Sequence, residues 1–208
     1  MIKIENTIVT GWEAAIRGAR MPLQSFAKSD SRYEDGHYVI GGNDLDLLSR
    51  LSSAGNDHGK FMRMIHVQCD ITCPVYFAAE LDTYKVGTTR NSSSLQHKGM
   101  SRDYTIDDFS TDLDGGEMSK WLKDYWERVI DGINDLRKRY VETKDYDCFR
   151  AMRQLMPMGY NYTFTWDANY AVLKNIYFAR KGHRLSEWET MREFIEELPH
   201  AEELIIGR

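Results

Sequence analysis

The sequence predicts a mixed α and β fold with several long helices and few strands, and three observations carry this prediction. Residues 116–143 place apolar side chains at helical spacing, which is typical of one long amphipathic helix. Residues 159–168 alternate aromatic and polar side chains, a period of two that indicates a strand. Residues 168–183 are mostly apolar and contain no glycine or proline before Gly182, which predicts a buried helix.

The first part of the chain shows strand, helix and loop patterns in turn. The expected elements are a strand at 2–10, a short helix at 11–23, a polar loop at 27–37, a short strand or bend at 38–44 and a helix at 44–55. Pro22 is expected to stop the first helix because proline lacks a backbone donor. Asn43 or Asp44 is expected to cap the second helix, and Gly55 to end it.

The middle of the chain predicts one further strand and one short helix. The expected elements are a strand within 58–74 that is buried on both faces, a helix at 74–85, a Ser/Thr/Asn-rich loop at 86–101 and an acidic, exposed segment at 104–117. Pro74 suits the first position of a helix, where a missing N–H group costs nothing.

The last part of the chain is predicted to be largely helical. Beside the elements named above, we expect helices at 147–157 and 186–199. Ser186 followed by Glu189 forms the pattern of a capping box. The apolar stripe of the long helix is predicted to be core or an oligomer interface; it consists of Trp121, Leu122, Tyr125, Val129, Ile130, Ile133 and Leu136. No repeat or linker is visible, so a single domain is expected over 1–208.

Composition narrows the function classes. The net charge of −5 and the pI of about 5.7 argue against broad binding to nucleic acids or membrane surfaces. No apolar run reaches the roughly 18 residues of a membrane span, and the start of the chain lacks the apolar core of a signal peptide. Three cysteines imply no disulfide framework, so the cytoplasm is the expected compartment.

The common catalytic and metal-binding motifs are absent. The sequence contains no GxGxxG, Walker, HExxH or GxSxG motif. Its six histidines are scattered, and Cys69 and Cys73 have no partners at zinc spacing. No metal site is therefore expected.

The helix at 168–183 carries the most informative polar residues. Asn169, Lys174, Asn175 and Arg180 interrupt its apolar side chains. At roughly 100° per residue, Asn169 and Arg180 return to nearly the same face. Buried amides and guanidinium groups need hydrogen-bond partners, so this helix is expected to hold a ligand or another polar group of the protein.

The C-terminal third resembles the flavin-dependent thymidylate synthases, the ThyX family. Arg153 precedes the segment QLMPMGYNYTFTWDA, and Asn169, Asn175 and Arg180 then reproduce the family's N-x₅-N-x₄-R pattern. The segment SEWETMREF is similar to the family's next helix. The resemblance implies that both asparagines contact the flavin. It also implies that Arg153 holds the nucleotide phosphate and that Arg180 polarises the pyrimidine base.

The resemblance extends upstream, where the family's R-H-R-x-x-S-x-N-E-x-S-x-R signature is mostly lost. His58, Pro74 and the following helix stand in the family's order. The resemblance implies flavin contacts for His58, Tyr84 and Lys85, and nucleotide contacts for Glu80, Ser92 and Ser94. Thr83, Tyr84 and Lys85 fall on R-H-R, and Gln96 falls on the last arginine.

The lost arginines leave a gap in the expected phosphate site. A lysine such as Lys85 is a point charge and does not reproduce the bidentate contacts of a guanidinium. Ser92, Ser93 and Ser94, with their backbone N–H groups, could take over a phosphate. Arg90 and Lys98 could add positive charge.

Each candidate residue also has a structural interpretation that the sequence leaves open. Arg180 could face the carbonyls at the end of its helix, Asn169 could be only a helix cap, and Arg153 could pair with Asp145 or Asp147. His58 could be a structural histidine, Lys85 could simply be solvated, and the serine-rich loop could be a plain turn.

Three functions follow from the resemblance. The first is a divergent thymidylate synthase that methylates a pyrimidine nucleotide such as dUMP, with FAD, methylene-tetrahydrofolate and NADPH. The second is a binding protein that kept the nucleotide pocket and lost FAD. The third is a related enzyme acting on a different pyrimidine. The resemblance also implies an α+β fold with a central, mostly antiparallel sheet, assembled as a homotetramer.

Overall fold

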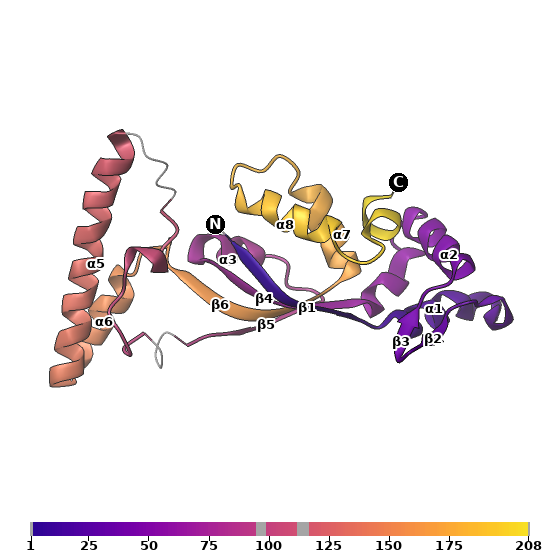
Figure 1. The fold of residues 1–208 in the computed structure, drawn as a ribbon, viewed down its shortest axis with the longest axis horizontal. Coiled ribbons are helices and arrows are strands. Elements are labelled where there is room, and N and C mark those ends of the chain that lie inside the picture. The colour runs from indigo at the N-terminus through magenta and orange to yellow at the C-terminus, as the bar shows by residue number, and fades with distance from the viewer. Residues whose placement is uncertain (1, 95–98, 112–116, 208) are drawn as a thin grey trace. The chain divides into compact units, whose positions relative to one another are not determined.

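A computed structural model of the chain describes residues 2–94, 99–111 and 117–207. Gln96, Lys98 and part of the predicted acidic segment lie outside the described residues. The observed architecture is α+β, as predicted, with an antiparallel sheet. Its strands are β1 (Lys3–Thr10), β4 (His66–Pro74), β5 (Thr88–Ser92) and β6 (Asn161–Asn169), in the order β1-β4-β6-β5 (Figure 1).

The chain folds into two compact units. The first unit comprises residues 1–3, 71–82 and 91–164, and the second comprises 4–70, 83–90 and 165–208. Each of the four strands has residues in both units.

The helices of the first unit are α3 (Val75–Leu81), α5 (Glu117–Thr143) and α6 (Tyr146–Leu155). The unit has its own apolar core, which α5, α6 and the segment around residues 104–109 form together. The core cluster consists of Tyr104, Phe109, Ile130, Ile133 and Met152. The predicted stripe of α5 is therefore core only in part. Trp121 and Tyr125 stack with ring centroids 5.6 Å apart, but both are more than half exposed.

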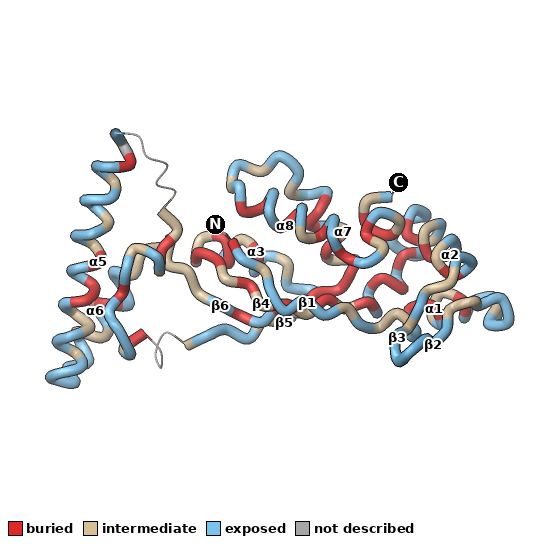
Figure 2. Tube along the Cα trace, viewed as in Figure 1, coloured by how far each residue is buried: buried red, intermediate tan, exposed pale blue. Residues whose placement is uncertain are grey.

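The second unit contains the remaining helices. They are α1 (Trp12–Arg20), α2 (Gly42–Ser53), α7 (Tyr170–Ala179) and α8 (Glu187–Glu196), with short 3₁₀ turns at Met21–Leu23, Phe26–Lys28 and Gly59–Met64 and a π-helical turn at Glu202–Ile206. Tyr170, Leu173 and Ile176 of α7 are fully buried, as are Trp188 and Met191 of α8. Buried stretches of both helices can be followed in Figure 2. The prediction of a buried helix at this position is confirmed.

The polar loop expected at 27–37 is a β-hairpin in its second half. β2 (Arg32–Glu34) pairs antiparallel with β3 (His37–Val39), and Tyr33 lies opposite Tyr38. Asp35 and Gly36 form the two-residue turn with φ values of 48° and 82°. Two positive φ values are what a tight hairpin turn requires, and Asp-Gly is a preferred pair for it.

The strand expected within 58–74 starts later and is buried on one face only. Residues Gly59–Met64 form a 3₁₀ turn, and β4 begins at His66. Val67, Cys69, Ile71 and Cys73 are buried, whereas the alternating residues are half-buried. The half-buried face is polar: Asp70 accepts hydrogen bonds from Asn6 and Thr165. Polar cross-strand pairs thus replace the second apolar layer that the sequence pattern suggested.

Helix α2 is capped from a distance rather than by Asn43 or Asp44. Its backbone N–H groups at Asn43 and Asp44 donate to the carboxylate of Asp30, at 2.9 and 3.1 Å. The Asp44 side chain is turned inward and paired with Arg20 at 2.5 Å. Gly55 follows the helix with φ 96°, as predicted for its end.

The predicted capping box of α8 is not formed. Ser186 is the N-cap residue but makes no side-chain capping hydrogen bond. Glu189 instead accepts from Arg192, with N–O distances of 2.8 and 2.9 Å. An ion pair within the helix has replaced the cap.

The three thiols are expected to differ in reactivity. Cys69 and Cys73 are buried in β4, and burial, aided by Asp70 and Asp167, raises the pKa of Cys69 to about 12. Cys148 is only half-buried. Because the thiolate is the reactive form, titration of the native protein with a thiol reagent should modify Cys148 and spare Cys69 and Cys73. All three should react after denaturation, and rapid native labelling of Cys69 would contradict this packing.

Within the described residues, no helix is long and apolar enough to cross a membrane. The same part of the chain holds no group of three or more histidine, cysteine or acidic residues placed to bind a metal ion.

Candidate functional site

Asn169 begins helix α7 and is tied to the backbone on two sides. Its Oδ1 accepts a hydrogen bond from the N–H group of Val172 at 3.1 Å, which caps the helix. Its Nδ2 donates to the carbonyl of Gly87 at 3.4 Å. Asn169 is 6% exposed. Asn169 therefore caps its helix, and one face of this residue also lines a cavity described below.

Gly87 is a position where only glycine fits. Its φ of 80° lies in the left-handed region, where other L-residues are strained. A Cβ atom at this position would collide with the Nδ2 atom of Asn169. Because Asn169 is fixed by its own cap, the glycine sets how closely the 83–90 segment approaches α7.

The cap makes Asn169 a determinant of stability. We expect Asn169→Ala to lower the free energy of unfolding by about 1–2 kcal/mol, because two backbone groups lose their partner. Asn169→Ser keeps a capping oxygen and should retain most of that stability. Asn43→Ala, at an exposed position, is the control and should change stability by less than about 0.5 kcal/mol. Urea unfolding curves measure all three, and equal stability of the alanine and serine variants would refute the capping role.

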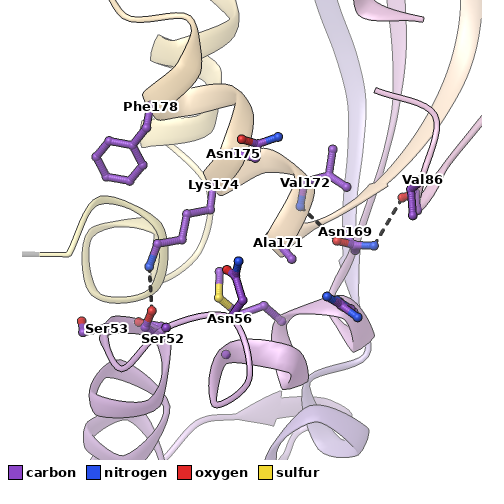
Figure 3. A pocket seen from close by; sticks show the side chains of 15 residues that line it. Ser52, Ser53, Asn56, Val86, Asn169, Ala171, Val172, Lys174, Asn175 and Phe178 are labelled. Carbon is purple, nitrogen blue, oxygen red and sulfur yellow. Dashed lines mark hydrogen bonds between the residues drawn. The ribbon is translucent and has the colours of Figure 1, made fainter. Parts of the chain in front are cut away.

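A cavity of about 810 Å³ lies in the second unit, bordered by α2, the Gly59–Met64 turn, the 83–90 segment and α7. This volume is within the range of small-molecule sites. The labelled residues in Figure 3 show α7 on one side and the end of α2 on the other. The lining residues are Ser52, Ser53, Gly55, Asn56, Gly59, Met62, Arg63, Val86, Gly87, Asn169, Ala171, Val172, Lys174, Asn175 and Phe178.

Both asparagines of the resemblance line this cavity. Asn175 is exposed, and its amide makes no hydrogen bond with the residues that the structure describes. An amide offers two donor hydrogens and an acceptor oxygen. The Asn175 side chain can therefore both donate hydrogen bonds to a ligand in the cavity and accept a hydrogen bond from it.

Lys174 crosses the cavity from α7 to α2. Its Nζ donates to the carbonyl of Ser52 at 3.0 Å (Figure 3) and to that of Leu204 at 3.2 Å. Burial lowers the pKa of Lys174, because a desolvated ammonium group is less stable than its neutral form.

Two cavity residues, Arg63 and Asn56, had no signal in the sequence that marked them as site residues. Arg63 belongs to the Gly59–Met64 turn, where the sequence pattern indicated a strand. Asn56 follows α2 in a segment that looked like an ordinary helix end. Only the folded chain brings them beside α7.

Arg180 lies at the end of α7 and packs against aromatic rings. Its Nε donates to the hydroxyl of Tyr84 at 2.9 Å. Its guanidinium carbon lies 4.4 Å from the ring centroid of Trp188 and 5.4 Å from that of Tyr84. These contacts hold the guanidinium group in one orientation. Arg180 is not among the residues that line the cavity.

The other predicted flavin residues of the second unit are accessible. His58 and Lys85 are exposed, and neither side chain is hydrogen-bonded to the residues that the structure describes. Tyr84 is half-buried, and its hydroxyl accepts from Arg180. In the structure, Tyr84 is thus hydrogen-bonded to Arg180. Asn169 and Asn175 line the same cavity.

The remaining predicted nucleotide residues, Glu80, Ser92, Ser94 and Arg153, belong to the first unit. Arg153 is exposed on α6 and forms no ion pair with the described residues. The alternative that Arg153 pairs with Asp145 or Asp147 is wrong. Asp145 instead caps α6 by accepting from the N–H group of Asp147 at 2.9 Å.

Comparisons with known proteins identify the fold. No protein-family model matches the sequence, and no curated protein matches it. Among solved structures, the flavin-dependent thymidylate synthase ThyX from Helicobacter pylori, complexed with FAD and dUMP, is 16% identical with a TM-score of 0.70. The match covers 98% of this chain and 97% of that chain.

A second structure of ThyX from Helicobacter pylori with FAD and dUMP is also 16% identical and has a TM-score of 0.69. That match covers 99% of this chain and 97% of the other. At this identity, the likeness identifies the fold. The chain therefore adopts the α+β fold of the ThyX flavin-dependent thymidylate synthases over nearly its whole length.

Proposed function

We propose that this protein binds FAD and catalyses the reductive C5-methylation of a pyrimidine nucleotide such as dUMP. Methylene-tetrahydrofolate would supply the carbon and NADPH the electrons. The observation that supports this proposal is the cavity of the second unit, which Asn169 and Asn175 both line in a chain of ThyX-like fold.

The cavity residues fit a flavin in size and in chemistry. The volume of about 810 Å³ suits a large ligand. The free amide of Asn175 can donate and accept, which matches the carbonyl and N–H groups along the edge of an isoalloxazine ring. Asn169 is fixed by its cap and by Gly87, so its position needs no further ordering when a ligand binds.

The bound flavin would supply hydride chemistry, and the protein would orient and polarise the reactants. In this proposal, Arg180 stabilises the negative charge that develops on a carbonyl of the pyrimidine ring. The rings of Tyr84 and Trp188 keep its guanidinium in place before the substrate arrives. His58, Tyr84 and Lys85 are proposed as further flavin contacts.

We propose Arg153, Ser92, Ser94 and Glu80 as further contacts of the nucleotide, as the resemblance implies. We also propose that the chain acts as a single domain over 1–208, assembles as a homotetramer and works in the cytoplasm. Binding to membranes or broadly to nucleic acids is not part of the proposal.

A second candidate is a nucleotide-binding protein that has lost FAD. It is favoured by the residues at the R-H-R positions, where Thr83 and Tyr84 carry no charge and Lys85 lacks a guanidinium. The third candidate is a related enzyme that acts on a different pyrimidine. It differs from the first candidate only in its substrate.

Complementation of a thymidine-requiring strain tests the proposed activity. Expression of this chain should restore growth without thymidine, and the purified protein with FAD should convert dUMP to dTMP. A well-expressed protein that binds FAD but leaves dUMP unchanged would point to another pyrimidine. A protein that binds dUMP and cannot be reconstituted with FAD would support the second candidate instead.

A further inference from the structure

We propose that Arg63 and Lys174 form an anion subsite of this cavity, which binds a phosphate group of the ligand. The inference rests on the proposed function for the choice of this cavity as the ligand site. It assigns a role to two residues for which the resemblance predicts none.

The charge of the cavity lining has one sign. Arg63 and Lys174 are the two side chains with a formal charge among the fifteen lining residues, and no carboxylate accompanies them. Some other cations of the same unit are paired with acids, as in Arg20 with Asp44 and Arg50 with Asp46. An uncompensated positive wall attracts an anion, and cavities strengthen such fields.

Arg63 is free to bind a ligand. Its side chain is exposed and makes no hydrogen bond or ion pair with the residues that the structure describes. A guanidinium group can give two parallel hydrogen bonds to a phosphate. Arg63 therefore has the geometry that Lys85, at a position of the lost signature, does not have.

Lys174 supplies a charge of fixed position. Two of its three donor hydrogens are used by the carbonyls of Ser52 and Leu204, so one remains for a ligand. Because these two hydrogen bonds already hold the Lys174 side chain in place, it loses less rotamer entropy on binding a ligand than an unrestrained lysine does. A partly desolvated ammonium group is also stabilised more by an anion than a fully hydrated one.

A phosphate ester is the shared chemistry of two possible ligands. It occurs as the diphosphate of a flavin dinucleotide and as the monophosphate of a nucleotide. Both would place an anion between α7 and the Gly59–Met64 turn, while the neutral part of the ligand contacts the asparagines and apolar residues. Binding of different probes to the same variants separates these sources.

The test measures dissociation constants of FAD, riboflavin, dUMP and inorganic pyrophosphate by calorimetry and flavin fluorescence. The decisive variant is Arg63→Gln, and its matched control is Arg17→Gln, an exposed arginine of α1 outside the cavity. Lys174→Met removes the second charge. Thermal unfolding of each variant identifies any loss of folding, and Arg63→Gln alone suffices if Lys174→Met does not fold.

We expect Arg63→Gln to weaken FAD or dUMP, and pyrophosphate, by about tenfold or more, because a charge-assisted hydrogen bond is lost. Riboflavin, which has no phosphate, should bind equally to Arg63→Gln and Arg17→Gln. Lys174→Met should act in the same direction as Arg63→Gln. The phosphate-bearing ligand that is weakened most identifies the source of the anion.

Two results would overturn the subsite. The first result is that Arg63→Gln binds the phosphate-bearing ligands with the same affinity as the wild type. The other is wild-type protein to which none of the phosphate-bearing probes binds. The proposed function fails separately: if no flavin binds but pyrophosphate binds in an Arg63-dependent way, the subsite stands and the flavin enzyme does not.

Discussion

Replacing Asp44 with alanine is expected to lower the free energy of unfolding by about 3–5 kcal/mol, because it leaves a buried arginine without its counter-ion. The side chains of Arg20 and Asp44 are 5% and 0% exposed, and their N–O distance is 2.5 Å. The second carboxylate oxygen of Asp44 accepts from Ser29 and Ser31. One substitution thus removes partners from a whole set of buried polar groups that joins α2 to the segment before it.

Asp46→Ala provides the matched control two residues away. Asp46 pairs with Arg50 at 2.9 Å, but both side chains are about two-thirds exposed. Such a pair contributes about 0–1 kcal/mol. Urea unfolding should therefore show a large loss for Asp44→Ala and a small loss for Asp46→Ala. Similar losses for the two variants would show that the buried network does not hold this part of the fold.

The same network predicts a dependence of stability on pH. Burial acts to raise the pKa of Asp44, but hydrogen bonds from Ser29, Ser31 and Arg20 outweigh it, so the pKa lies below its usual value. The stabilisation is thus present above the unfolded-state pKa of about 3.9 and is lost as the pH falls through the lower, folded-state pKa. Urea midpoints measured from about pH 6 to about pH 2 should fall more for the wild type than for Asp44→Ala.

Replacing Arg180 with alanine is expected to reduce turnover by about 100- to 1,000-fold, the usual cost of removing one group that stabilises developing negative charge. This prediction rests on the proposed activity. Arg180 is held against Trp188 and Tyr84, so thermal unfolding must be measured beside kcat. Arg180→Lys keeps the charge and should retain part of the lost activity.

Arg184→Ala is the control for Arg180. Arg184 is an exposed arginine four residues further along the chain, and its loss should leave kcat unchanged. If Arg180→Ala lowers stability but not kcat in the folded fraction, Arg180 is a structural residue that fastens the end of α7 to α8. A loss of kcat with little change in stability supports the polarising role.

Local patterns predicted several elements correctly but missed β5, which lies in the segment expected as a Ser/Thr/Asn-rich loop. The alternation in β6 and the apolar periodicity of α5 and α7 placed these elements within a few residues. The errors arose where distant residues decide the structure. Asp30 caps α2 from 13 residues upstream, and the polar pairs on β4 are made by another strand. Neither partner is visible from the local sequence.

The candidate site was predictable only in part, and for a similar reason. Polar residues within an apolar helix identified Asn169 and Asn175, both of which line the cavity. Lys174 was visible only as an interruption of that helix. Arg63 stands in a turn and carried no signal, since an exposed arginine is common on protein surfaces. The fold places it in the lining of the same cavity as Lys174.

Titration of the purified protein with FAD tests the central claim most directly, because that claim is that amides of α7 bind a flavin in the cavity. We predict a blue-absorbing, stoichiometric complex whose affinity falls about tenfold or more in Asn175→Ala, through loss of ligand hydrogen bonds. Asn43→Ala should bind like the wild type. Because Asn175 is exposed, its variant should remain folded. Absence of flavin binding by the folded wild type, or equal affinity in Asn175→Ala, would contradict the account.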